Sequence, residues 1–126
     1  MTISIYDPYL VIPGYGENNI GLNFIKGNLN LKIFYDCLQD DSQKVIDITF
    51  INVCYHKCCN FPGVNDSNYI NQRYSDITSL VEFENSELKN LWELHFNHVF
   101  KFRHFKIIFT NANYVLDVIC QELILP

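Results

Sequence analysis

The sequence predicts a single α+β domain: a mostly antiparallel β-sheet with one principal amphipathic helix packed on it. Several short segments alternate apolar and polar residues, the period of a half-buried strand, and turn-forming residues separate them. One segment, residues 86–99, instead has the apolar spacing of a helix. The chain of 126 residues has the length of one domain, so we assign residues 1–126 to a single unit.

The first third of the chain predicts a short strand, a loop and a hairpin. Residues 1–19 open with strand-forming residues and continue into a segment that Pro and Gly interrupt. Residues 20–24 and 29–35 then alternate on either side of the turn-forming residues 26–28. This pattern is typical of a hairpin with one wet and one dry face.

The longest strand candidate runs from Lys44 to Lys57. Apolar residues occur on both of its faces, which indicates a central strand. Residues 61–68 contain Pro62 and Gly63 and are expected to form a loop. A short strand over residues 80–84 precedes the helix.

The helix has a clear start and an apolar stripe. Asn85 or Ser86 can cap it by accepting a hydrogen bond from a free backbone amide, and Glu87 then lies near the positive end of the helix dipole. The residues at helical spacing are Leu88, Leu91, Trp92, His95, Phe96 and Val99. We expect this stripe to face the core, with Trp92 as its anchor against the sheet.

Residues 103–109 and 114–120 predict a second hairpin. Aromatic and β-branched residues dominate both segments, as half-buried strands require. Asn111 and Asn113 lie between them and tolerate a left-handed backbone. We expect this hairpin at the edge of the core.

The charge balance argues against a nucleic-acid groove. Nine basic and fourteen acidic residues give a formal net charge of -5, the wrong sign for binding phosphates, whereas a basic protein partner suits it. No apolar run is long enough to span a membrane, and the N-terminus lacks the features of a secretory signal. These observations predict a cytoplasmic protein.

One cluster, Cys54-Tyr55-His56-Lys57-Cys58-Cys59, has residue types that bind metals. On a strand Cys54, His56 and Cys58 would share a face, but the spacing is not the two-residue gap of zinc ribbons. The sequence therefore favours reduced thiols that pack as small apolar side chains over a zinc site. We expect no metal and no cofactor.

The histidines leave an acid–base enzyme open as an alternative. His56, His95, His98 and His104 belong to no ordered catalytic motif, so we assign no catalytic residue. The local concentrations of negative charge are instead candidates for partner binding: Asp40, Asp41, Glu82, Glu84 and Glu87. If these carboxylates are not the contact, the segment Phe61–Tyr74 is the next candidate.

The order of elements over residues 48–124, about three-fifths of the chain, resembles a family of small proteins. A strand over 48–53 precedes a helix that opens with Asn85-Ser86-Glu87-Leu88 and carries Trp92. A His-aromatic strand (Arg103–Phe109) and a last strand (Leu116–Cys120) follow. This order is similar to that of bacterial immunity proteins of polymorphic toxin systems, including contact-dependent growth inhibition. The Cys cluster in residues 54–64 departs from it.

The resemblance implies a non-enzymatic cytosolic inhibitor that binds one cognate toxin domain, typically a nuclease, and silences it without turnover. Nuclease active sites attract phosphates and tend to be basic, so an acidic partner complements them. Neither direct nucleic-acid binding nor membrane binding is implied. The alternatives are a small enzyme that uses its histidines, and a ligand-binding or scaffold domain.

Overall fold

The computed structural model describes residues 2–14, 16–60, 79–109 and 111–126. The helices are a short 3-10 helix η1 (Pro8–Leu10) and the α-helix α2 (Glu87–His95). The strands are β1 (Thr2–Tyr6), β2 (Asn19–Ile25), β3 (Asn28–Asp36), β4 (Gln43–Ile51), β5 (Tyr55–Asn60), β6 (Leu80–Phe83), β7 (Arg103–Phe109), β8 (Tyr114–Cys120) and β9 (Glu122–Ile124).

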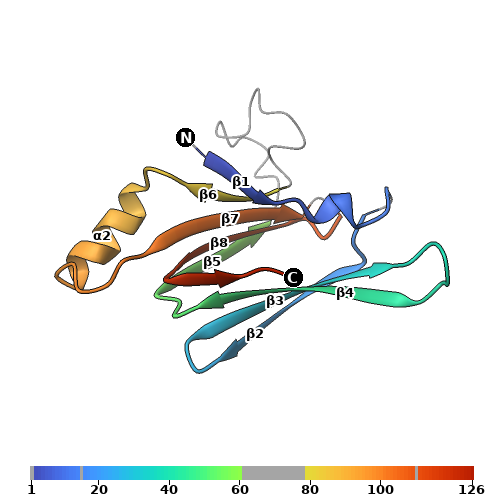
Figure 1. Cartoon of the computed structure of the whole chain (residues 1–126), viewed down its shortest axis with the longest axis horizontal. Helices are drawn as coiled ribbons and strands as arrows, with labels where there is room; N and C mark the ends of the chain where they lie inside the picture. Colours follow the sequence, from blue (N-terminus) through green and yellow to red (C-terminus); the bar gives the residue numbers. More distant parts are fainter. Residues whose placement is uncertain (1, 15, 61–78, 110) are drawn as a thin grey trace.

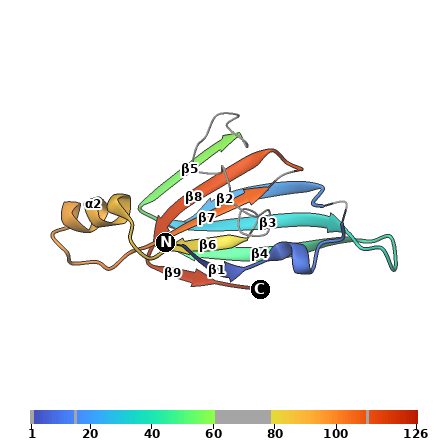
Figure 2. The same ribbon diagram turned by 90° about the horizontal axis from the view of Figure 1, so that it is seen from above.

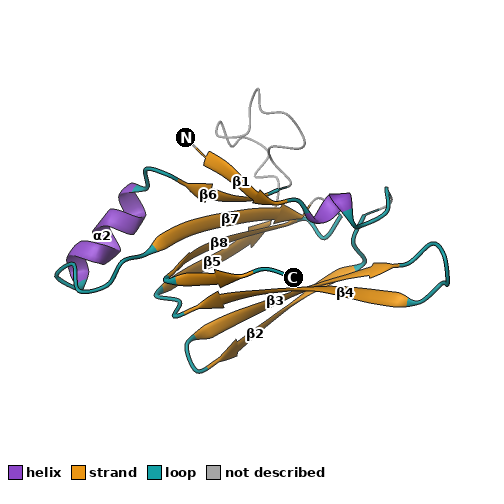
Figure 3. Cartoon of the chain, viewed as in Figure 1, coloured by secondary structure: helices purple, strands orange, loops and turns teal. Residues whose placement is uncertain are grey.

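The strands form two antiparallel sheets that face each other as two layers (Figures 1 and 3). One sheet has five strands in the order β1-β6-β7-β8-β5, and the other has four in the order β2-β3-β4-β9. The helix α2 lies beyond one end of the layers, as the two perpendicular views agree (Figures 1 and 2). The predicted class, α+β with mostly antiparallel sheet and one principal helix, is confirmed.

Both predicted hairpins form. β2 pairs with β3 around Lys26 and Gly27, whose φ angles of 52° and 83° are the two left-handed positions of a tight hairpin turn. β7 and β8 have the predicted bounds, and Asn113 adopts the left-handed backbone expected of it, at φ 53°. Turn chemistry therefore determines the register of both hairpins.

The single long strand from Lys44 to Lys57 was a wrong prediction. The chain leaves the four-stranded sheet after β4 and joins the five-stranded sheet as β5. The break occurs at Asn52, which has a left-handed backbone at φ 55°. The Cys54 amide then donates to the Ile119 carbonyl on β8, so the strand direction changes where the chain crosses between layers.

The core lies between the two sheets. Its buried residues are Ile12, Leu29, Leu31, Ile33, Ile46, Ile48, Phe50, Leu80, Phe105, Ile107, Phe109, Leu116, Val118 and Cys120. The β7–β8 hairpin is also buried on its outer face, where Ile108, Val115 and Ile119 lie. The hairpin is therefore central, and the expectation that it would lie at the edge of the core was wrong.

The helix is shorter than predicted and does not contribute to the core. It ends at His95 instead of residue 99, because Asn97 and His98 adopt left-handed backbones at φ 54° and 57°. None of its nine residues, all of them described, is buried. The predicted loop at residues 61–68 lies outside the described residues. No helix in the described ranges is long and apolar enough to span a membrane.

Candidate functional site

The end of the molecule that carries α2 exposes a large apolar surface. We call residues 84–102, which comprise α2 and its flanking segments, the helical end. Leu91 and Leu94 are 62% and 59% exposed, and Val99 and Phe100 beyond the helix are 72% and 42% exposed. Of the stripe predicted to face the core, three residues are exposed and three are half-buried, and none is buried; the exposed ones are Leu91, His95 and Val99. Contiguous exposed apolar surface of this kind marks interaction sites.

Aromatic rings attach the helical end to the sheets. The aromatic cluster consists of Tyr55, Trp92, His95, Phe96, Phe100 and Phe102. Trp92 reaches β5 through Tyr55, with the ring centroids 6.2 Å apart, and Phe96 lies 5.8 Å from Phe102. Trp92 is half-buried. The expectation that it anchors the helix as core was therefore wrong, since Phe102 is the buried member of this cluster and Trp92 is not.

A buried polar chain fixes the start of the helix. The predicted cap is confirmed: the Lys89 amide donates to Ser86 Oγ at 3.0 Å. Ser86 Oγ also lies 2.6 Å from His104 Nδ1, and His104 Nε2 contacts the Asp117 carboxylate on β8. Because a carboxylate only accepts, His104 Nε2 donates to Asp117, and the Ser86 hydroxyl, which accepts from the Lys89 amide, can donate its own hydrogen to Nδ1. Neither His104 nor Asp117 had been assigned this role from the sequence.

A hydroxyl, an imidazole and a carboxylate in a row can also form a nucleophilic triad. A nucleophilic serine needs a lone pair directed at open space that a substrate carbonyl can reach. Ser86 is only 6% exposed, and its oxygen already holds both the Lys89 amide and His104. The ring is also reversed relative to the usual triad, in which Nε2 faces the serine. This geometry favours a structural anchor over a nucleophile.

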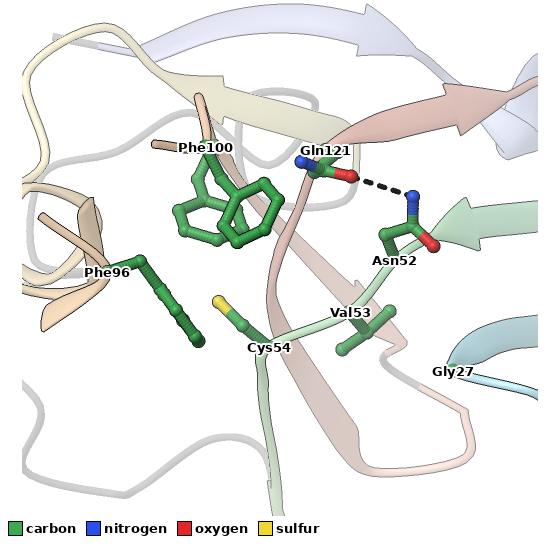
Figure 4. Close-up of a pocket in the computed structure, with 8 residues that line it drawn as sticks. Gly27, Asn52, Val53, Cys54, Phe96, Phe100 and Gln121 are labelled. Atoms are coloured by element: carbon green, nitrogen blue, oxygen red, sulfur yellow. Dashed lines mark hydrogen bonds between the residues drawn. The ribbon is translucent and has the colours of Figure 1, made fainter. Parts of the chain in front are cut away.

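A hollow of about 410 Å³ lies between the helical end and the turns of the sheets. Phe96, Phe100 and Phe102 form one wall, and Val53 and Cys54 form the other (Figure 4). Asn52 Nδ2 donates to Gln121 Oε1 at 2.7 Å on its rim. We call it the Phe100 hollow.

Two further concavities flank it. One of about 420 Å³ lies on the other side of Phe100 and Phe102 and includes Lys101, Arg103 and Glu122. Another of about 280 Å³ runs along the helix between Leu88, Leu91, Trp92 and His95. The Phe100 hollow was not predicted from the sequence, although the alternation Phe100-Lys101-Phe102 outside any predicted strand was a signal for it.

The structure separates the predicted acidic residues. Asp40 and Asp41 lie in the β3–β4 turn, at the opposite end of the molecule from α2 (Figures 1 and 2). Glu84 and Glu87 are exposed where the helix starts. The structure thus brings two of the five candidates to the helical end.

Glu82 is already paired within the protein. Its carboxylate accepts from Arg103 Nε at 2.9 Å and Arg103 Nη2 at 2.7 Å, a bidentate pair. The guanidinium also lies 4.8 Å from the centre of the Phe105 ring. Glu82 is therefore less available to a partner than Glu84 and Glu87.

Local hydrogen bonds lower the pKa of Asp40 to about 2, first through the Ser42 hydroxyl and then through the Ser42 amide. Because this pKa lies below the unfolded value of about 3.9, the contribution of Asp40 to stability is present above about pH 4 and is lost as pH falls through about 2. We expect Ser42→Ala to raise the Asp40 pKa toward the unfolded value in an NMR titration. The matched control is Asp47, whose pKa is lowered by Lys32 and should not change.

The cysteine cluster lies along β5, with Cys54 directly before the strand. All five cysteines are free thiols, of which Cys58 and Cys59 are exposed on β5 and Cys120 is buried. Within the described ranges no three His, Cys, Asp or Glu side chains lie close enough to hold a metal ion. Burial raises the pKa of Cys54 to about 11 and that of Cys120 to about 12. Because the thiolate is the reactive form, Cys54 reacts slowly with electrophiles. Its side chain lines the Phe100 hollow.

No family model matches the chain, and no curated protein or solved structure is significantly similar to it.

Proposed function

We propose that the protein is a bacterial immunity protein that binds and neutralises a cognate toxin domain without turnover. The observation that carries the proposal is the helical end, where Leu91 and Leu94 face solvent on a helix without a buried residue and Phe100 is exposed beyond it. Aromatic residues in an exposed apolar patch are typical of the centre of a protein–protein interface. The inhibitor acts in the cytoplasm and contacts neither nucleic acid nor membrane.

Charge supports a basic toxin, such as a nuclease. The chain has a formal charge of -5. Glu84 and Glu87 are exposed at the start of α2, and the exposed Glu122 lines the same concavity as Phe100 and Lys101. A nuclease carries positive charge to attract phosphates, and opposite charges at a rim speed association.

The chain Ser86–His104–Asp117 favours a second candidate, a hydrolase. The two functions differ in turnover, so purified protein should be assayed against an activated ester, RNA and DNA. We expect no activity and no labelling of Ser86 by a fluorophosphonate. Turnover that survives repurification and disappears in Ser86→Ala would replace the inhibitor proposal with the enzyme.

The inhibitor proposal predicts that a secreted protein with a toxic C-terminal domain is encoded beside this chain, and co-expression with that domain tests it. We expect a host that produces this domain to grow only when the chain is also produced, and the purified proteins to form a 1:1 complex. Unchanged toxicity, together with the absence of a complex in size-exclusion chromatography, would refute the proposal.

Charge reversal tests where the toxin binds. We expect Glu84→Lys and Glu87→Lys to slow association, most strongly at low salt, because they invert rim charges at the helical end. Asp40→Lys is the matched control, since it makes the same charge change at the opposite end and should associate like the parent. Association rates measured by surface plasmon resonance at two salt concentrations show whether the toxin contacts the helical end. An effect of Asp40→Lys alone would move the contact to the β3–β4 turn.

A further inference from the structure

The Phe100 hollow has the composition of an anchor site. Its walls are aromatic and aliphatic, and Figure 4 shows the Cys54 sulfur directed toward the space between Phe96 and Phe100. The polar groups are confined to the rim, where Asn52 and Gln121 satisfy each other in part through one hydrogen bond. An apolar group that enters the hollow therefore displaces water without leaving a buried polar atom unpaired.

The shape of the hollow selects what can fill it. Phe100 is 42% exposed although it forms part of the wall, so the hollow is open on that side. Small-molecule sites bury most of the ligand surface, which an open wall does not allow. A side chain that projects from a partner protein does not need an enclosed site, because the surface of the partner covers the open side of the hollow. The volume of about 410 Å³ has room for one large side chain and its immediate neighbours.

The surrounding charges select the surface that presents this side chain. Glu84, Glu87, Glu93 and Glu122 lie on the helical end or beside it, against Lys89, Lys101 and Lys26, which precedes Gly27, a residue that lines the hollow. The Arg103 guanidinium is neutralised by its bidentate pair with Glu82. Four carboxylates against three ammonium groups leave a net charge of -1 on these seven residues, within a chain of net charge -5. A second copy of the same chain would bring like charge to this rim, whereas a basic surface brings the complement.

We propose that the Phe100 hollow receives one large apolar side chain that the cognate toxin presents from a basic surface. This inference rests on the proposed function, because it assumes that the toxin binds at all. It adds the anchor of the interface: the apolar contact governs dissociation, and the carboxylate rim governs association.

Cys54 reports directly on occupancy of the hollow. Trypsin cleaves after Lys44 and Lys57, so one peptide carries Cys54 alone and the next carries Cys58 and Cys59. Alkylation with iodoacetamide at about pH 9 can then be followed by mass spectrometry at each site, with the exposed pair as the internal control. We expect saturating toxin domain to slow alkylation of Cys54 at least tenfold and to leave Cys58 and Cys59 unchanged.

A substitution provides an independent readout. We expect Phe100→Ala to weaken toxin binding at least about 30-fold, mainly through faster dissociation, as for an interface hot spot. Leu38→Ala is the control, because Leu38 is also an exposed apolar residue (69%) but lies in the β3–β4 turn. It should bind like the parent.

The outcomes separate the two proposals. A toxin that binds without protecting Cys54, and that binds Phe100→Ala like the parent, would overturn the anchor and leave the inhibitor proposal intact. Absence of any binding would overturn the proposed function itself. Protection of Cys54 that depends on protein concentration without toxin would assign the hollow to a second copy of the chain and also overturn the anchor.

Discussion

Phe105→Ala lowers the free energy of unfolding by about 3–5 kcal/mol, the expected cost of removing a fully buried aromatic side chain. Phe105 is completely buried on the inner face of β7, and its ring lies 6.0 Å from that of Phe50 on β4. It therefore connects the two sheets at their centre. Stabilities of such domains are about 5–15 kcal/mol, so the variant loses a large share of the total.

Urea unfolding followed by circular dichroism measures this loss, and a fall in Tm on the order of 10–20 °C accompanies it. Phe100→Ala is the matched control, since it removes the same side chain from a partly exposed position. We expect that variant to lose about 1 kcal/mol or less. If the two variants unfold alike, the sheets do not pack through Phe105, and the assignment of the core between them is wrong.

The fold class was predictable because local sequence patterns identify the two hairpins. Strand period and turn residues act over neighbouring positions, so Lys26-Gly27 and Asn113 identify their turns without knowledge of the rest of the chain. The crossing between sheets was not predictable in the same way. Asn52 interrupts a run of strand-forming residues, and its left-handed backbone depends on which sheet each half joins. The three-residue β9 was also missed, because so short a strand has no period to detect.

The candidate site was less predictable than the fold. An apolar stripe at helical spacing is the same pattern whether it faces a core or a partner. Trp92 and Leu91 were expected to pack on a sheet. The inner face of each sheet is instead covered by the other sheet, and the helix lies beyond the end of both sheets. The polar chain from Ser86 to Asp117 spans three elements, so only the three-dimensional structure brings its members together.

His104→Ala should destabilise the protein by about 2–4 kcal/mol, the second largest effect we expect. The imidazole is buried, 8% exposed, between Ser86 at the start of α2 and Asp117 on β8, with Phe83 against its face at 4.4 Å. Its removal leaves the buried Ser86 hydroxyl without its partner, at a cost of about 1–3 kcal/mol. It also removes the ring contact with Phe83 and the partner of the Asp117 carboxylate, which is 24% exposed. The helix start then loses its attachment to the sheet.

The reference variant is His95→Ala, which removes an exposed histidine from α2 itself and should cost about 1 kcal/mol or less. Ser86→Ala removes both the cap and the hydroxyl partner of His104, so the double variant with His104→Ala should lose less than the sum of the two single variants. Because the chain anchors the helical end, His104→Ala should also weaken toxin binding, whereas hydrogen exchange in the β2–β3 hairpin stays slow. If His104→Ala unfolds within 1 kcal/mol of the parent, the chain does not anchor α2. The hydroxyl, imidazole and carboxylate of Ser86, His104 and Asp117 would then be candidates for catalysis.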